Sequence, residues 1–306
     1  MLAEKTLEKL RILAESAKYD VSCSSSGTVR SGKKGMVGNT VGGVGICHSF
    51  ADDGRCISLL KVMLTNHCMY DCAYCVNRRS NDIKRATLSV SELEEITMEF
   101  YRRNYIEGLF LSSGVVRNPD YTMERLTAIV RDLRLVHRFN GYIHLKAIPG
   151  ASQELLNVAG RYADRMSVNI EIPREESLKM LAPEKDHQSV FQPMKLIQQG
   201  VLENKEDRQR MRHAPRFVPA GQSTQMIVGA TKDSDREILT MSSLLYGQPS
   251  MRRVYYSGYV SVNTFDSRLP VLKQPPLVRE NRLYQADWLL RFYHFKVEEV
   301  VDDLHP

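Results

Sequence analysis

Three cysteines stand close together in the chain, separated by three and then two residues: Cys68, Cys72 and Cys75. They follow the apolar run at 57–64, and an aromatic residue, Tyr74, precedes the last of them. Iron–sulfur cubanes normally take four cysteines. Three thiolates at this spacing can bind three irons and leave the fourth iron open to a small molecule. The spacing therefore predicts a 4Fe–4S cluster with a non-protein fourth ligand.

A zinc site is the alternative interpretation of the same cysteines. Zinc prefers four nitrogen or sulfur ligands, and His67 or Cys56 could supply the fourth. This interpretation explains neither Tyr74 nor the position of the cysteines directly after an apolar run. A non-catalytic, zinc-stabilised nucleic-acid-binding protein therefore stays as the rival from a different class.

Composition and charge restrict the class of protein and where it is expected in the cell. The chain has 306 residues, 42% hydrophobic and 25% charged, which suffices for a globular core. No apolar stretch approaches the ~20 residues that span a bilayer, and the charged N-terminus lacks the apolar core of a signal peptide. We therefore expect a cytoplasmic protein without membrane association, whose clustered thiols indicate metal or redox chemistry. The net charge of +6 hints at an anionic partner.

Strands and helices alternate from residue 57 onward, which predicts right-handed βαβ units and a parallel sheet. Expected strands cover 57–65, 108–113, 142–147, 166–172, 224–229 and 252–262. Expected helices cover 89–104, 122–137, 152–162, 187–200 and 233–246. A full eight-fold barrel needs ~250 residues, more than this region holds. The fold class is therefore α/β, a partial (β/α)6 TIM-type barrel.

Three segments follow from this pattern. Residues 1–56 hold an N-terminal helix and a Cys- and Gly-rich loop, 57–263 the partial barrel, and 264–306 a C-terminal extension packed on it. Helical spacing assigns an apolar face to the first helix through Leu2, Leu7, Leu10 and Leu13. In the extension we expect a helix over 280–293, with an apolar face made of Trp288, Leu289 and Phe292.

In parallel barrels the site lies at the carboxyl ends of the strands. The cysteines follow the first strand, so they belong to that end. The second expected strand ends in Ser112, Ser113 and Gly114, where small residues permit close approach to the backbone. The fourth carries Asn169 and Glu171. The alternatives are turn-forming serines and an ordinary buried, paired glutamate.

The cysteine motif is similar to that of the radical S-adenosylmethionine (SAM) enzymes, in which the open iron binds the amino and carboxylate groups of SAM. The resemblance implies reductive cleavage of SAM to methionine and a 5′-deoxyadenosyl radical, with Tyr74 among the cofactor-binding residues. Ser112, Ser113 and Gly114 resemble the segment whose backbone receives the SAM amino group.

Two further strand ends resemble cofactor-binding segments of the same superfamily. Asn169 and Glu171 look like polar residues that reach the ribose or the methionine moiety. Ile227 and Gly229 partly match the segment G-x-I-x-G-x-x-E beside the adenine. The sequence departs from that segment in having Gln225 for its first glycine and Lys232 for its glutamate.

Several segments resemble, more narrowly, a family of DNA modification or repair radical SAM proteins: YDVSCSSSG, LTNHCMYDCAYCVNRRSND, LFLSSGVV, FVPAGQSTQMIVGAT and RLYQADWLLRFY. Its members are encoded beside a uracil-DNA-glycosylase-like protein and continue into a helix-hairpin-helix region, before which this sequence stops. The resemblance implies a nucleobase in DNA or RNA as substrate and an electron donor of the flavodoxin or ferredoxin type. A small molecule or a peptide stays open as the alternative substrate.

The remaining cysteines and cations allow two further functions. Cys23, Cys47 and Cys56 could bind an auxiliary iron–sulfur cluster or be unrelated structural thiols. A basic run before the fifth expected strand could contact phosphates or be an ordinary solvated stretch: Lys205, Arg208, Arg210, Arg212, His213 and Arg216. Three tyrosines on the sixth expected strand could stack on a base, although packing is the simpler expectation: Tyr255, Tyr256 and Tyr259.

Overall fold

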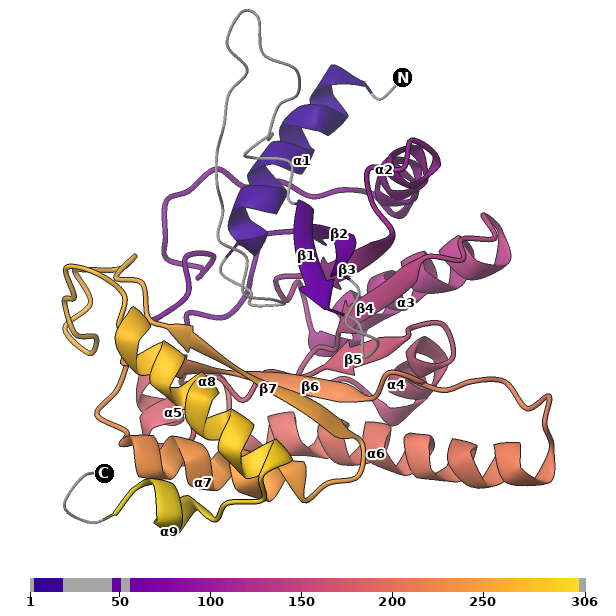
Figure 1. The fold of residues 1–306 in the computed structure, drawn as a ribbon. Helices are drawn as coiled ribbons and strands as arrows, with labels where there is room; N and C mark the ends of the chain where they lie inside the picture. The colour runs from indigo at the N-terminus through magenta and orange to yellow at the C-terminus, as the bar shows by residue number, and fades with distance from the viewer. Residues whose placement is uncertain (1–2, 19–45, 51–55, 303–306) are drawn as a thin grey trace, which may run out of the picture.

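The computed structural model describes residues 3–18, 46–50 and 56–302 of the chain, with the side chains at 48–50 and 56 left undescribed. The described chain curls into one seven-stranded sheet, with helices along its outer face (Figure 1). The strands follow one another in the sheet in the order of the sequence: β1 (Ile46–Phe50), β2 (Cys56–Met63), β3 (Gly108–Ser112), β4 (Tyr142–Lys146), β5 (Arg165–Ser167), β6 (Gln222–Val228) and β7 (Met251–Gly258).

Strands β2 to β7 are all parallel, which confirms the predicted partial (β/α)6 barrel. Strand β1 was not predicted, because we expected only loop between the first helix and residue 57. It pairs antiparallel with β2, with Cys47 opposite Leu59. Consecutive side chains of a strand point to opposite faces. Leu60 therefore joins the core beneath the helices, whereas Leu59 packs with Phe110 on the inner face.

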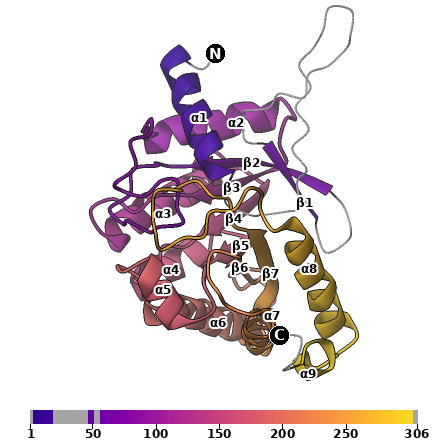
Figure 2. The same cartoon turned by 90° about the vertical axis from the view of Figure 1, so that its left-hand side faces the viewer.

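The helices run back between the strands and cover the convex side of the sheet (Figures 1 and 2). Their bounds are α1 (Glu4–Ala17), α2 (Val90–Arg102), α3 (Pro119–Leu135), α4 (Gln153–Gly160), α5 (Glu175–Leu181), α6 (His187–Arg210), α7 (Asp235–Tyr246), α8 (Leu277–Phe292) and α9 (Val297–Val300). No helix in the described ranges is both long and apolar enough to cross a membrane.

Local signals set several of these boundaries. A capping box opens α2: Ser89 Oγ accepts from Glu92 N at 3.0 Å, and Ser89 N donates to Glu92 Oε2 at 2.8 Å. Helix α1 buries Leu10 and Leu13 as expected, but Leu7 is exposed. Leu2 lies outside the described residues.

Helix α6 differs from the expectation in length. It continues ten residues beyond Gly200, to Arg210, so much of the basic run lies on a helix rather than in a loop. At ~1.5 Å per residue its 24 residues span about 36 Å. Because the helix runs back along the barrel, its basic end lies far from the carboxyl ends of the strands.

The apolar face predicted for the C-terminal helix is wrong. Trp288 and Phe292 are each 52% exposed, with ring centroids 4.3 Å apart on the outside of α8. Leu289 is half-buried. The face that packs on the barrel holds Leu283, Ala286, Asp287 and Leu290. Asp287 is polar yet fully buried, because Tyr246 donates to its Oδ1 and Arg291 to its Oδ2. Because this face contains a charged residue, Asp287, the sequence pattern did not identify it as the buried face.

Two substitutions on α8 should separate these faces. Leu283→Ala should lower the free energy of unfolding by about 2–5 kcal/mol, because it opens a cavity in the core. Trp288→Ala should cost less than about 1 kcal/mol, as expected for an exposed position. Urea unfolding of both variants measures the difference. A larger loss of unfolding free energy for Trp288→Ala than for Leu283→Ala would show that Trp288, and not Leu283, faces the barrel.

Candidate functional site

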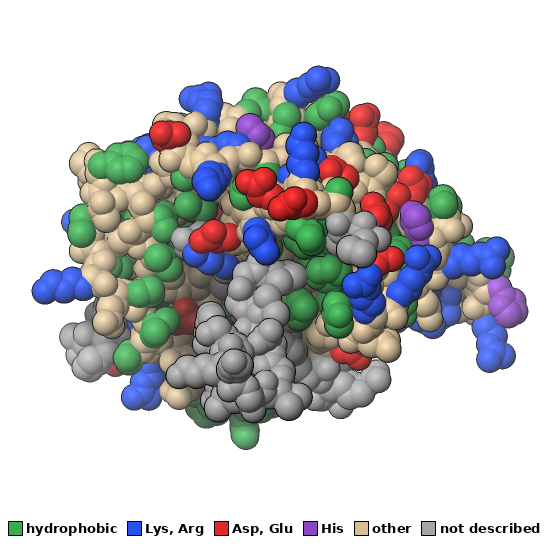
Figure 3. All heavy atoms as spheres, turned by 90° about the horizontal axis from the view of Figure 1, so that it is seen from above, with side chains coloured by type: hydrophobic (Ala, Val, Ile, Leu, Met, Phe, Trp, Pro, Cys, Tyr) green, Lys and Arg blue, Asp and Glu red, His purple; other side chains and the backbone are tan. Residues whose placement is uncertain are grey.

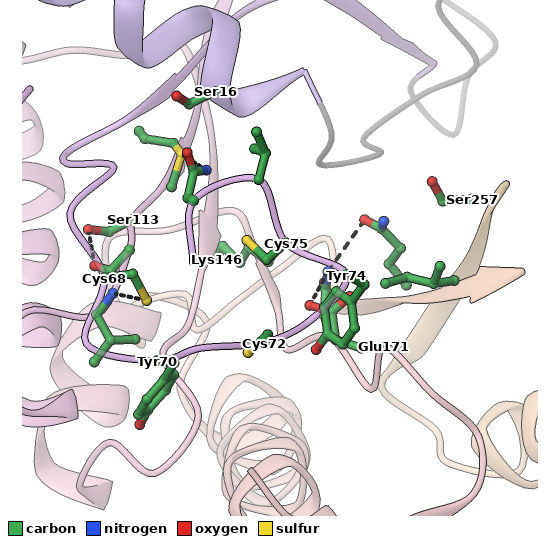
Figure 4. Close-up of a pocket in the computed structure, with 18 of the residues that line it drawn as sticks. Ser16, Cys68, Tyr70, Cys72, Tyr74, Cys75, Ser113, Lys146, Glu171 and Ser257 are labelled. Atoms are coloured by element: carbon green, nitrogen blue, oxygen red, sulfur yellow. Dashed lines mark hydrogen bonds between the residues drawn. The ribbon is translucent and has the colours of Figure 1, made fainter. Parts of the chain in front are cut away.

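The three cysteines line one pocket at the carboxyl ends of the parallel strands (Figure 4). The loop that carries them leaves β2 and crosses this end of the barrel, with Cys68 beside Ser113 and Tyr74 beside Glu171. The pocket encloses about 1380 Å³ of empty space, including its mouth.

The first part of the cysteine loop is fixed to the end of β3. Met69 N donates to the carbonyl of Val115 at 2.7 Å, and Val115 N donates to Cys68 Sγ at 3.5 Å. A Cβ at Gly114 would lie 2.2 Å from the carbonyl oxygen of His67. Gly114 is therefore required for contact with the cysteine loop itself, a role that the sequence analysis did not assign to it.

Arg85 fixes both ends of the loop. Its Nη1 donates to the carbonyls of Asn66 and Asn77, and its Nη2 to those of Arg78 and Asn81, over 2.5–2.9 Å. These carbonyls lie on both sides of the three cysteines. One planar guanidinium with several fixed donors therefore sets the distance between the two ends of the loop.

The segment that follows β7 fixes the middle of the loop. Asn263 is buried, and its Nδ2 donates to the carbonyls of Ala73 at 2.6 Å and Cys75 at 3.1 Å. Nearby, Arg78 and Asp266 form a buried ion pair at 2.7 Å. Hydrogen bonds from Arg268 and then Arg78 hold the pKa of Asp266 well below its usual value. The cysteine loop is thus fixed by contacts from both halves of the barrel.

Burial makes the thiols reluctant to ionise. It raises the pKa of Cys75 to about 12, with a further contribution from Cys72, and it also raises the pKa of Cys72. Without a compensating cation these thiols stay protonated at neutral pH. Metal ions deprotonate coordinating thiols outright. With Cys72 buried and Cys68 and Cys75 half-buried, the thiol set suits a metal cluster better than a surface reactive cysteine.

Lys185 is a pocket residue that the sequence analysis missed. It lies between α5 and α6, is half-buried, and places Nζ 3.4 Å from Tyr74 Oη. Burial disfavours its charge, but Cys72, Tyr74 and Glu171 together outweigh burial and raise the pKa of Lys185. Because Lys185 lies in the loop between α5 and α6, no helix or strand pattern in the sequence predicts its place in the pocket.

Most of the predicted cofactor-binding residues meet in the pocket. Its lining includes Tyr74, Ser113, Gly114, Asn169, Glu171 and Ile227. Ser112 and Gly229 are not part of the lining. Ser112 is buried below it, its hydroxyl without a hydrogen-bond partner among the described residues, and Gly229 lies at φ +86° against Pro276.

Glu171 has an unusual backbone. Its φ is +66°, which is costly for a residue other than glycine, by about 1–3 kcal/mol. The neighbouring strand holds it there, since Glu171 N donates to the Gln225 carbonyl at 2.9 Å and Ile227 N donates to the Glu171 carbonyl at 2.7 Å. Asn169 Nδ2 lies 3.4 Å from both Glu171 Oε1 and Gln225 Oε1. The strain directs a carboxylate into the pocket.

The tyrosines of the last strand have different surroundings. Tyr259 lines the pocket, with its buried hydroxyl unpartnered among the described residues. Tyr256 is buried on the helix side, where its hydroxyl donates to Ser242 Oγ at 2.8 Å. Tyr255 is half-buried. Of the three, Tyr259 is the one positioned to meet a ligand in this pocket.

Of the other cysteines, the structure describes the side chain of Cys47 alone. Cys47 packs against Leu59 and Phe110 and does not line the pocket. Cys23, the glycine-rich loop and the side chain of Cys56 lie outside the described residues. In the described ranges, no three His, Cys, Asp or Glu side chains converge on a position for a single metal ion. A cubane binds each thiolate through a different iron, so its ligands need not converge as the ligands of one zinc ion do.

Comparison with known proteins agrees with this geometry. Residues 62–205 match the sequence profile of the radical SAM superfamily. A search of curated protein sequences finds no significant match. These residues therefore form a radical SAM domain, the domain of an enzyme superfamily, and this superfamily implies a 4Fe–4S cluster and SAM.

Solved structures share the partial barrel. The FeFe-hydrogenase maturase HydG from Carboxydothermus hydrogenoformans is 13% identical with a TM-score of 0.57, covering 76% of this chain and 51% of its own. Methylornithine synthase (PylB) is 16% identical with a TM-score of 0.51, and the match covers 72% of this chain and 60% of the PylB chain. A radical SAM methyltransferase from Sphaerobacter thermophilus is 13% identical with a TM-score of 0.50, covering 78% and 68%. This chain spans about half the length of the HydG chains. At these identities the likeness establishes the fold.

Removing the guanidinium of Arg85 should release the cysteine loop. Arg85→Met should lower the free energy of unfolding by at least about 3 kcal/mol, because several hydrogen bonds to a charged group, at about 1.5–3 kcal/mol each, are lost. Arg79→Met is the matched control, since exposed Arg79 makes one 3.3 Å bond to the Met69 carbonyl. Urea unfolding and limited proteolysis across 66–81 measure both. Equal stability of the two variants would contradict this role of Arg85.

Proposed function

We propose that the chain is a radical SAM enzyme whose 4Fe–4S cluster is held by Cys68, Cys72 and Cys75. The observation that supports this most directly is the meeting of three cysteines and the polar strand ends in one pocket. When bound, the cluster supplies the electron that cleaves SAM to methionine and a 5′-deoxyadenosyl radical. The buried thiols and the three-cysteine loop fit such a cluster, and the fourth iron would be left to SAM.

We propose SAM contacts for the pocket residues that resemble the superfamily segments. The backbone at Ser113 and Gly114 would receive the amino group. Asn169 and Glu171 would bind the ribose or methionine moiety through hydrogen bonds, and Ile227 would pack beside the adenine. Ser112 and Gly229 would act indirectly, by shaping the ends of β3 and β6, since neither lines the pocket.

The protein's share of the chemistry is to orient the ligands and exclude water. Tyr74 closes one side of the cysteine loop, and Tyr259 and Val260, which follow β7, close another part of the lining. Ser16 extends the lining from α1. The pocket is thus enclosed by side chains from the first helix and the last strand as well as by the loop, as a radical intermediate requires.

For the substrate we propose a nucleobase in DNA or RNA. Support comes from the resemblance to DNA modification or repair proteins and from the net charge of +6. The same resemblance supports a flavodoxin- or ferredoxin-type electron donor and a uracil-DNA-glycosylase-like partner. Lys205, Arg210, Arg212, His213 and Arg216 are exposed around the end of α6. Figure 3 shows Lys and Arg side chains gathered at that end of the molecule.

The place of this basic end restricts how nucleic acid could bind. Helix α6 begins beside Lys185 in the pocket and ends about 36 Å away. A duplex repeats every ~34–36 Å, so a strand touching both places would extend about one helical turn from the reacting base. The basic end would therefore contribute non-specific phosphate contacts, remote from the chemistry.

Loss of any one of the three cysteines should abolish the proposed activity. Cys68→Ala, Cys72→Ala and Cys75→Ala should each abolish cluster assembly and 5′-deoxyadenosine formation, because two thiolates cannot retain a cubane with an open iron. Iron content, absorbance near 400 nm and product chromatography after anaerobic reconstitution measure this. Cys47→Ala is the control and should keep both properties. A single variant with full iron and SAM cleavage would refute the ligand assignment, and a colourless wild type with one zinc would favour the rival class.

Nucleic-acid binding should be weak and should depend strongly on salt. Each phosphate contact contributes a log–log slope of about −0.9 for duplex DNA. Charge reversal at Arg210, Arg212 and Arg216 should therefore flatten the slope by about three units and leave SAM cleavage unchanged. Arg208 is excluded, because its Nη1 holds the Ala214 carbonyl.

The control for this experiment is charge reversal at three exposed cations on other helices. Arg103, Arg131 and Lys179 each form an ion pair with a neighbouring carboxylate, on α2, α3 and α5. Fluorescence anisotropy over a range of salt concentrations measures the slopes. If both triple variants change the slope equally, the basic end of α6 is not the contact surface. Absence of binding at low salt would favour a small-molecule or peptide substrate.

A further inference from the structure

We infer that Lys185 sets the reduction potential of the cluster, acting as a fixed positive charge beneath the cysteine loop. This inference rests on the proposed function, since it needs a cluster on the three cysteines. A cation close to a buried cluster stabilises the form that has gained an electron, and local charge and exposure are among the factors that tune Fe–S potentials. The electron must enter the cluster before SAM can be cleaved.

Lys185 is held against the loop by the segment around it. Ala73 N donates to the Leu181 carbonyl at 2.6 Å, Asp71 N donates to Glu184 Oε1 at 3.2 Å, and Lys185 N donates to the Ala182 carbonyl at 2.9 Å. The end of α5 and the following turn are therefore joined to the cysteine loop. These contacts fix the backbone of Lys185 beside the cysteine loop.

The side chain of Lys185 is directed at the thiol side of the pocket. Its Nζ lies 3.4 Å from Tyr74 Oη and 5.8 Å from the centre of the Tyr74 ring, and Tyr74 directly precedes Cys75. Lys185 lines the same pocket as Cys72 and Cys75. Because Lys185 is half-buried, water screens its charge less than at an exposed position.

The other charges near the pocket differ in position from Lys185. Lys18, directly after α1, and Lys146, at the end of β4, also line it. Glu171 lines it as well, and Glu184 lies beside the loop, where its Oε1 accepts from Asp71 N. A neutral residue at 185 would remove one positive charge from among these groups, so the cluster would become harder to reduce.

The test is an EPR-monitored redox titration of the reconstituted protein without SAM. Lys185→Met should lower the midpoint potential by at least about 59 mV, a tenfold change in the reduced fraction for one electron. Lys185→Arg keeps the charge and should stay near the wild-type potential. Lys179→Met removes an exposed lysine of α5, paired with Glu175 at 3.1 Å, and should change nothing. Iron content and thermal unfolding are measured for every variant.

An unchanged potential in a folded, fully loaded Lys185→Met protein overturns the inference. If its SAM affinity falls while the potential is unchanged, Lys185 binds the cofactor carboxylate instead. Should Lys185→Met not take up iron, Lys185→Gln replaces it in the same comparison. If neither neutral variant takes up iron but Lys185→Arg does, the charge serves cluster assembly and not the potential, which overturns the inference. If Lys185→Arg also fails to take up iron, the shape of the lysine side chain and not its charge is needed, which overturns the inference. A wild type that forms no cluster refutes the proposed function, and this inference falls with it.

Discussion

The site depends on fixing a loop that has no regular hydrogen bonding of its own. Buried backbone carbonyls need partners, and leaving one unpaired costs about 1–3 kcal/mol. In this protein, side chains from elsewhere supply them: Arg85 bonds carbonyls on both sides of the cysteines, and Asn263 bonds two between them. Arg85 follows β2 and Asn263 follows β7, the first and last parallel strands. The loop geometry therefore depends on the curl of the whole sheet.

The parallel sheet explains how distant residues reach one pocket. Because β2 to β7 point the same way, residues that follow each strand collect at one end of the barrel. Asn169 and Glu171, which follow β5, both line the pocket at this end. The strained backbone of Glu171 persists because Gln225 and Ile227 bond both its N–H and its carbonyl. Stability elsewhere in the sheet thus maintains a conformation that no isolated segment would adopt.

Local patterns made the barrel and much of its pocket predictable. The alternation of strands and helices and the position of the cysteines directly after the first parallel strand are short-range signals, and the structure shows the parallel sheet and places the three cysteines in one pocket. Long-range relations were not predictable. Strand β1 exists through pairing with β2, and Gly114 is required by the carbonyl of His67, which no single segment encodes. Helix α8 was assigned the wrong face because buried Asp287 takes its partners from α7, β7 and α8 itself.

Charge balance links the buried thiols to their surroundings. Three lysines and one carboxylate are among the described lining residues: Lys18, Lys146, Lys185 and Glu171. Burial keeps Cys72 and Cys75 neutral as thiols, so ionising them adds negative charge to a region where lysines outnumber carboxylates. Such charge is costly in a low dielectric unless opposite charge lies nearby. Lys185 therefore reduces the cost of ionising Cys72 and Cys75. The three lining lysines lie directly after α1, at the end of β4 and before α6, so the charge of the pocket, like its geometry, depends on segments from the complete sheet.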